Sequence, residues 1–208
     1  MKTWETLRQV MHLSGLVVIL IAYFLGDNLT GILSIAFGIF LFFLSYYVKI
    51  RNEIRKKLPI RVKKLEELED IFFEVIESLA KERSEYYYVG AILFFISSGI
   101  SLIIFPEKIA FISVTILAVG DSLSTFVGVH WGRHKTMINP RKSYEGTVGG
   151  FLSSFLVCLI FTNPIVSFVA SLIGATVELL PIKINDNLLI PISVGLVLLV
   201  MKSFGIPI

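Results

Sequence analysis

The sequence has few charged residues and almost no cysteine. Only 17% of its 208 residues are Asp, Glu, Lys or Arg, whereas 55% are hydrophobic and the mean hydropathy is +0.80. A soluble domain of this length has more surface than so few charges can cover, so the apolar excess indicates a membrane protein. The single cysteine, Cys158, excludes a disulfide framework and a CxxC metal site. No repeat or low-complexity segment divides the chain, which predicts one domain over residues 1–208.

Apolar runs predict about seven transmembrane helices. A spanning helix needs about 17–25 mostly apolar residues. The predicted spans are 10–25, 29–48, 86–105, 109–131, 147–161 (extended back to 143), 164–181 and 188–204. The predicted fold is therefore an all-α, polytopic transmembrane helix bundle.

Basic residues predict the orientation of this bundle. With a cytoplasmic N-terminus, every Lys and Arg except Lys108 and Lys202 falls in the inner segments 1–9, 49–85, 132–146 and 182–187. The N-terminal stretch lacks a small-x-small cleavage site, so it is interpreted as a retained span. The small size favours a prokaryotic plasma membrane. Basic inner loops suit anionic headgroups or a phosphate-bearing substrate, and no nucleic-acid partner is expected.

The longest inner segment, 49–85, predicts a cytoplasmic amphipathic helix. Its apolar residues recur at spacings of three and four, with Lys and Glu between them. They are Leu65, Leu68, Phe72, Val75 and Leu79. We interpret the segment as a structural connector on the membrane surface.

The chemistry is predicted within residues 120–150. Asp121 interrupts an apolar span, and an ionisable residue inside a membrane indicates a functional site. Helical spacing puts Asp121, Thr125 and Gly128 on one face, with Ser124 one step round. The glycines have a second interpretation, close helix packing through small residues, which the spacing leaves open.

A basic loop and a helix start follow this span. Lys135, Asn139 and Lys142 lie in the loop, and Ser143 is a natural N-cap. The N–H groups of a helix start bind phosphate readily, and Gly146 and Thr147 fall in this first turn. Glu145 paired with Asp121 would hold Mg²⁺. No Walker GxxxxGK[ST] motif is present.

Further polar residues fall on the same predicted membrane face. Glu178 lies one turn before the end of the sixth span, and Asp186-Asn187 opens the seventh. Asp186 is alternatively a helix cap, and His12 is alternatively a structural histidine at the membrane interface. Acidic groups with basic loops indicate a Mg²⁺–nucleotide site beside a bilayer. The predicted class is a lipid enzyme that uses a nucleoside triphosphate, with phosphoryl and nucleotidyl transfer both open.

Three stretches carry a resemblance to a known family: GDSLSTFVGVHWGRHK, NPRKSYEGTVGG and ELLPIKINDNLLIP. In these stretches the sequence resembles the dolichol kinase/phytol kinase group of CTP-transferase-like membrane proteins. The resemblance implies a CTP-dependent, Mg²⁺-assisted kinase that phosphorylates a long-chain isoprenoid alcohol of the dolichol or polyprenol type and releases CDP. The residues that match the group's nucleotide-handling motifs are Asp121, Lys142, Ser143, Glu145, Gly146 and Thr147, and those that match its downstream acidic block are Glu178, Asp186 and Asn187.

Residues and resemblance together predict four sets of site residues. The catalytic set is Asp121, Lys142, Glu145 and Asp186, and the metal set, for Mg²⁺ or another divalent cation, is Asp121, Glu145 and Glu178. The CTP-binding set is Lys135, Asn139, Lys142, Ser143, Gly146 and Thr147. The set lining the substrate cavity is His12, Ser124, Thr125, Gly128, Glu178 and Asn187. The alternatives are a CTP-dependent diacylglycerol kinase, a phosphatidate-type cytidylyltransferase and a non-enzymatic transporter, and a homodimer is an open alternative for the assembly.

Overall fold

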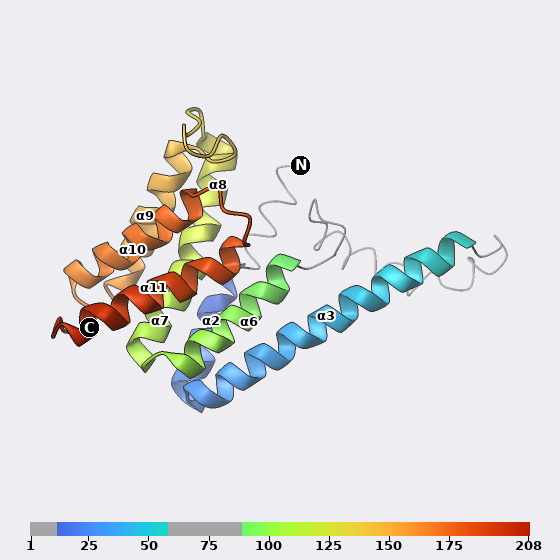
Figure 1. Ribbon diagram of the computed structural model, residues 1–208, viewed down its shortest axis with the longest axis horizontal. Helices are drawn as coiled ribbons and strands as arrows, with labels where there is room; N and C mark the ends of the chain where they lie inside the picture. Colours follow the sequence, from blue (N-terminus) through green and yellow to red (C-terminus); the bar gives the residue numbers. More distant parts are fainter. Residues whose placement is uncertain (1–11, 58–88) are drawn as a thin grey trace.

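The computed structural model describes residues 12–57 and 89–208, which form an all-α bundle (Figure 1). The helices are α2 (Gly15–Leu25), α3 (Asp27–Lys57), α6 (Val89–Ile104), α7 (Glu107–Thr115), the π-helix η1 (Ile116–Asp121), α8 (Ser122–Trp131), α9 (Tyr144–Cys158), α10 (Pro164–Leu179) and α11 (Asp186–Ser203). Within the described ranges there is no β-strand, only one isolated bridge between Lys135 and Ser143. The predicted all-α fold is confirmed.

Each predicted span overlaps one described helical segment, with α7, η1 and α8 forming a single continuous one. By length and composition, the segments Asp27–Arg51, Glu107–Trp131 and Asp186–Ser203 can cross a membrane, and α2, α6 and α10 are shorter apolar helices. α3 continues to Lys57, and its C-terminal half extends beyond the other described helices (Figure 1). The predicted amphipathic helix over residues 65–79 lies outside the described residues.

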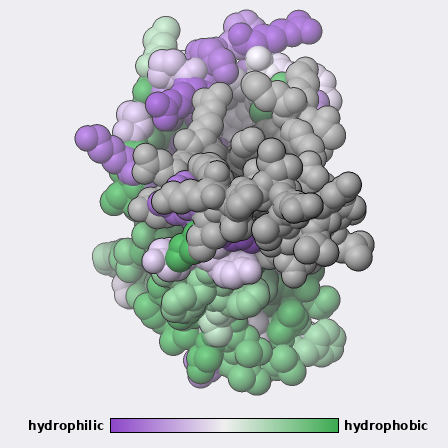
Figure 2. Space-filling view, turned by 90° about the vertical axis from the view of Figure 1, so that its right-hand side faces the viewer, coloured by the Kyte–Doolittle hydropathy of each residue, from purple (hydrophilic) through white to green (hydrophobic). Residues whose placement is uncertain are grey.

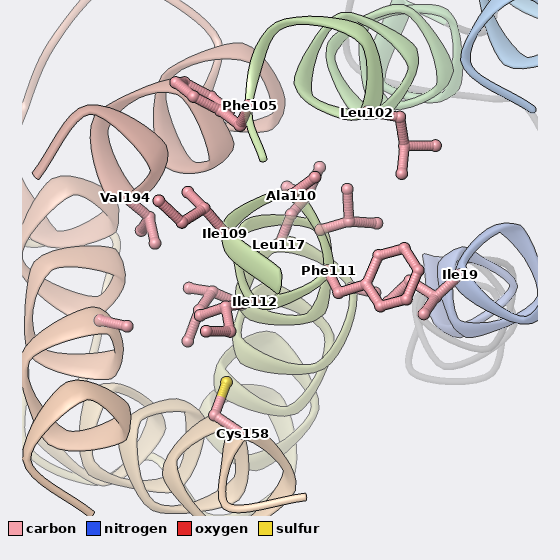
Figure 3. Packing of buried hydrophobic residues seen from close by; sticks show 14 of the residues in the cluster. Ile19, Leu102, Phe105, Ile109, Ala110, Phe111, Ile112, Leu117, Cys158 and Val194 are labelled. Atoms are coloured by element: carbon pink, nitrogen blue, oxygen red, sulfur yellow. The ribbon is translucent and has the colours of Figure 1, made fainter. Parts of the chain in front are cut away.

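The core of the bundle surrounds the central segment formed by α7, η1 and α8. All residues from Ile109 to Gly120 are buried. Figure 3 shows side chains of this segment, such as Ile112 and Leu117, among residues of neighbouring helices, including Cys158 of α9 and Val194 of α11. Large apolar side chains remain exposed on the outer helices, for example Phe43 on α3. An apolar exterior around an apolar core is the pattern of a bundle surrounded by lipid.

Hydrophilic residues gather at one end of the described bundle and hydrophobic residues at the other, on the face that Figure 2 shows.

Three of the described helices begin at side-chain caps. Ser143 Oγ accepts from Gly146 N–H at 3.2 Å, as predicted, and Asn163 Oδ1 accepts from two N–H groups of α10. Asn185 Oδ1 accepts from Asn187 N–H at 3.0 Å. These caps fix where α9, α10 and α11 begin.

The π-helix η1 ends at Asp121. A π-segment inside an α-helix is rare and occurs often at functional sites. It changes the helical register up to Asp121, so the four-residue spacing that runs from Asp121 into α8 does not continue back into α7. The sequence analysis did not predict this segment, although the Gly120-Asp121 pair in an apolar helix marks its position.

Helices α8 and α9 approach each other through glycines. A Cβ atom built on Gly146 would lie 2.7 Å from Ser124 O and 3.0 Å from Gly128 Cα. One built on Gly150 would lie 2.7 Å from Gly120 O. This close approach matches the helix-packing interpretation of Gly128. It also places the loop that precedes α9 against α8.

Candidate active site

A cavity of about 250 Å³ opens where helices from distant parts of the sequence meet. Its lining residues are His12, Gly90, Asp121, Thr125, Lys142, Ile182, Ile184, Asn185, Asp186 and Asn187. Six of these were predicted as site residues from the sequence: His12, Asp121, Thr125, Lys142, Asp186 and Asn187. The structure therefore brings together residues from the N-terminal region, η1, α8, the loop before α9 and the start of α11.

Among the described residues that line this cavity, Lys142 is the one Lys or Arg side chain. Its Nζ donates to Glu178 Oε1 at 2.5 Å and lies 3.8 Å from Asp186 Oδ2. Burial lowers the pKa of Lys142, but the nearby carboxylates of Glu178, Asp121 and Asp186 outweigh this effect and raise the pKa above its ordinary value. Lys142 is therefore a permanent ammonium at neutral pH.

Glu178 links Lys142 to α8. It lies in the last turn of α10, and its Oε1 accepts from Ser124 Oγ at 2.6 Å as well as from Lys142. Its side chain is only 6% exposed, compared with 23% for Lys142 and 32% for Asp186. Glu178 does not line the large cavity. A second, water-sized cavity of about 10 Å³ has both Asp121 and Glu178 in its wall.

Among the residues that the structure describes, the charges of the site do not balance. Asp121, Glu178 and Asp186 contribute three carboxylates, and Lys142 contributes one ammonium. A negative excess repels a polyphosphate unless a further cation enters with it. Within the described residues there is no group of three or more His, Cys, Asp and Glu side chains placed to hold a metal ion. Asp121 and Asp186 on the cavity wall fit Mg²⁺, which commonly uses one or two carboxylates together with substrate phosphates.

The loop before α9 is shaped by its own hydrogen bonds. Lys142 N–H donates to Asn139 O at 2.9 Å, and Thr136 N–H donates to Lys142 O at 3.2 Å. Arg141 N–H donates to Asn139 Oδ1 at 3.2 Å. Asn139 thus directs the chain toward Lys142, and neither Asn139 nor Lys135 lines the large cavity. Their roles in CTP binding stay predictions.

The first turn of α9 differs from the predicted phosphate site in its partners. Tyr144 N–H donates to His134 O at 3.0 Å, and Gly146 N–H donates to the Ser143 cap. Thr147 Oγ1 donates to Ser143 O at 3.1 Å. These groups already have protein partners in this conformation, and Gly146 is buried against α8. CTP binding by Ser143, Gly146 and Thr147 stays a prediction.

Glu145 lies apart from Asp121. Its Oε1 is 2.6 Å from His134 Nδ1, and both of its carboxylate oxygens accept from His134 N–H at 3.2 Å. Neither cavity includes Glu145 in its wall. The structure therefore does not bring Glu145 to Asp121, and the predicted metal pair of these two residues is not assembled.

The start of α11 differs from the sequence-based alternative in one residue. Asn185, and not Asp186, is the N-cap, so Asp186 stands at the first helical position beside Lys142. Asn187 is buried, and its side-chain Nδ2 donates to Gly90 O at 2.8 Å. Its backbone carbonyl accepts from Ser97 Oγ at 2.6 Å. Asn187 thus fixes α11 against α6. Sequence reasoning missed Asn185, although an Asn before Asp-Asn is itself an N-cap signal, and it had no signal for Ile182 and Ile184.

His12 lies on the wall of the large cavity, and its ring centroid is 5.2 Å from that of Phe94 in an edge-to-face arrangement. Gly128 lies between α8 and α9, where a Cβ would be 3.2 Å from Ser143 Oγ. His12 is therefore placed at the predicted cavity, whereas Gly128 is placed in helix packing.

Comparison with known proteins gives a family and several relatives. The model of the cytidylyltransferase family matches residues 84–205, which is more than half of the chain. The CTP-dependent diacylglycerol kinase 1 of Schizosaccharomyces pombe is 29% identical over 63% of this chain and 69% of its own length. The phytol kinase of Synechocystis is 28% identical over 93% of this chain and 78% of its own length. An uncharacterised protein of Methanocaldococcus jannaschii is 32% identical over 93% and 92%.

These matches confirm the resemblance to the CTP-dependent lipid kinase group that the three sequence stretches indicated. The matched region contains η1, α8, the loop before α9, α10 and the start of α11, and so contains Lys142 together with Asp121, Glu178 and Asp186. No solved structure matches the chain.

Proposed function

We propose that this chain, which belongs to the cytidylyltransferase family, is a CTP-dependent lipid kinase that phosphorylates a long-chain isoprenoid alcohol of the dolichol or polyprenol type and releases CDP. The observation that carries the proposal is the Lys142 ammonium held among Asp121, Glu178 and Asp186 at a cavity in a membrane helix bundle. Relatives named as a CTP-dependent diacylglycerol kinase and as phytol kinases support the reaction class.

Lys142 supplies the contact to the CTP phosphates. An ammonium has three N–H donors, and among the described residues one of them has a hydrogen-bond partner, Glu178. The remaining donors can bind phosphate oxygens and stabilise the negative charge of the phosphoryl group during transfer. Mg²⁺ would be held by Asp121 and would offset the negative excess of the site. Bound there, it would supply Lewis-acid chemistry that stabilises the negative charge of the phosphates.

Asp186 faces the acceptor. It adjoins Ile182 and Ile184, which are the apolar side chains of the cavity wall and are exposed enough to contact a lipid chain. In this arrangement Asp186 accepts the proton of the lipid hydroxyl, and the hydroxyl oxygen forms a bond to the γ-phosphorus of CTP. The bond from that phosphorus to the β–γ bridging oxygen breaks, and CDP leaves.

An isoprenoid alcohol is the acceptor that the relatives favour. The phytol kinase of Synechocystis aligns with 93% of this chain, and phytol is an isoprenoid alcohol. The diacylglycerol kinase aligns with 63%, which makes diacylglycerol the second candidate acceptor. The distribution of Lys and Arg supports a site on the cytoplasmic face. The small size favours a prokaryotic plasma membrane as the location of the protein.

The test uses purified protein in nanodiscs with Mg²⁺ and with CTP labelled at either the γ- or the α-phosphate. The acceptors are a short polyprenol, phytol, diacylglycerol and phosphatidate. We expect label from γ-CTP, and none from α-CTP, on the polyprenol. Faster transfer to diacylglycerol would identify diacylglycerol as the acceptor and would leave the proposed kinase activity intact. Label from α-CTP on phosphatidate would identify a cytidylyltransferase, and no transfer to any acceptor would contradict an enzymatic function.

A further inference from the structure

We infer that Glu178 is the residue that positions Lys142, with Ser124 fixing the Glu178 carboxylate, and that Glu178 is not a ligand of the metal ion. This inference rests on the proposed kinase function, because the group being positioned is the one that would bind the CTP phosphates. It replaces the metal role that the sequence predicted for Glu178.

The contacts of Glu178 define its role. A single oxygen, Oε1, accepts from both Lys142 Nζ at 2.5 Å and Ser124 Oγ at 2.6 Å. The three residues come from the loop before α9, from α8 and from α10, so the carboxylate joins parts of the chain that are otherwise separate. Two charge-assisted hydrogen bonds on one buried oxygen restrict the side chain to one orientation.

The burial of Glu178 separates it from the other two carboxylates. Its side chain is 6% exposed, and it has no part in the wall of the 250 Å³ cavity, where Asp121 and Asp186 both lie. Under the proposed function, the CTP phosphates and their metal ion would occupy that cavity. Moving Oε1 of Glu178 into that cavity would break its hydrogen bonds to both Lys142 and Ser124.

Lys142 gains a defined position from this contact. A lysine side chain is long and flexible, and an unrestrained ammonium would move among the carboxylates around it. With one N–H bound to Glu178, the ammonium is held 3.8 Å from Asp186 Oδ2 at the cavity wall. A displacement of about 1 Å in such a group can lower a reaction rate about 100-fold, so the positioning contact matters as much as the charge.

The first test is a double-mutant cycle of Glu178→Gln and Lys142→Met in nanodiscs. We measure kcat for transfer from γ-labelled CTP and the Mg²⁺ concentration at half-maximal rate. If Glu178 acts through Lys142, Glu178→Gln lowers kcat about 100-fold, and the double variant is no slower than Lys142→Met alone. The half-maximal Mg²⁺ concentration of Glu178→Gln stays within about twofold of wild type, whereas that of Asp121→Asn rises about tenfold or more. A Mg²⁺ shift in Glu178→Gln like that of Asp121→Asn, or losses that multiply in the double variant, would overturn the inference.

The second test keeps all charges in place. Ser124→Ala removes one hydrogen bond from Glu178. Its matched control is Ser122→Ala, also on α8, because among the described contacts Ser122 Oγ bonds only to Ala118 O, four residues earlier in the same continuous helical segment. We expect Ser124→Ala to lower kcat about tenfold with an unchanged Mg²⁺ requirement, and Ser122→Ala to match wild type. Equal activity of the two serine variants would contradict the role of Ser124.

A thermal measurement separates failure of this inference from failure of the proposed kinase. The unfolding midpoints of Glu178→Gln, Lys142→Met and the double variant are compared without CTP. We expect the double variant to unfold at a higher temperature than the sum of the two single losses predicts, because it removes the buried Glu178 carboxylate together with the ammonium bonded to it. If wild type transfers no phosphoryl group from CTP, this thermal cycle still tests the contact between Glu178 and Lys142. Strictly additive losses in unfolding midpoint would show that Glu178 does not hold Lys142.

Discussion

Replacing Gly146 by alanine tests whether close packing of α8 and α9 builds the site. The new Cβ would lie 2.7 Å from Ser124 O and 3.0 Å from Gly128 Cα, whereas ordinary contact begins near 3.4 Å. Both neighbours on α8 are backbone atoms, so the helices have to separate by several tenths of an ångström. Overpacking of this kind costs about 1–3 kcal/mol, and alanine recovers about 1 kcal/mol in helix propensity. The rigid neighbours place the cost at the upper end, so the expected net loss is about 2 kcal/mol.

The activity should fall with the stability, because Lys142 enters the site only four residues before Gly146. A shift of several tenths of an ångström between Lys142 and the Ser124–Glu178 pair is expected to lower kcat about tenfold. The assay combines the unfolding midpoint in detergent with γ-phosphoryl transfer from CTP. Gly120→Ala is the stability control, since its Cβ would meet no described atom closer than 3.6 Å. A Gly146→Ala protein that is as stable and as active as wild type would refute the packing argument.

Three further predictions follow from individual contacts. Glu145→Gln should leave the half-maximal Mg²⁺ concentration unchanged in the transfer assay, because Glu145 bonds to His134 and lies outside both cavities; a large rise would restore its predicted metal role. Asn185→Ala should lower the free energy of unfolding by about 1 kcal/mol through loss of the α11 cap, measured by denaturation in detergent, and an unchanged value would contradict the cap assignment. Ile184→Asp should raise KM for the lipid alcohol and leave KM for CTP unchanged, whereas Ile160→Asp, in the loop after α9, should change neither; a selective rise in KM for CTP would place the nucleotide against Ile184.

The all-α fold was predictable from the sequence because bilayer thickness fixes the length of an apolar span. The Ser143 cap was predictable because capping depends on residues a few positions apart. The gathering of Asp121, Lys142 and Asp186 at one cavity also followed, since their positions along the spans put them on one face of the membrane.

The pairing of side chains within the site was not predictable in the same way. Lys142 and Glu178 are 36 residues apart, and their contact depends on how α9 and α10 pack. Glu145 was expected beside Asp121, but it lies beside His134 because the loop folds back on the first turn of α9. The packing role of Gly146 likewise depends on the distance between two helices, which spacing within one helix cannot give.

The most direct test of the central claim compares wild type with Lys142→Met and Asp121→Asn in γ-phosphoryl transfer from labelled CTP to a short polyprenol. Unfolding midpoints first establish that both variants are folded. We predict that wild type transfers the γ-label and not the α-label, and that each folded variant loses at least about 100-fold in kcat. Near-wild-type transfer by folded Lys142→Met protein would contradict the claim that the Lys142 ammonium, held among the three carboxylates, handles the CTP phosphates.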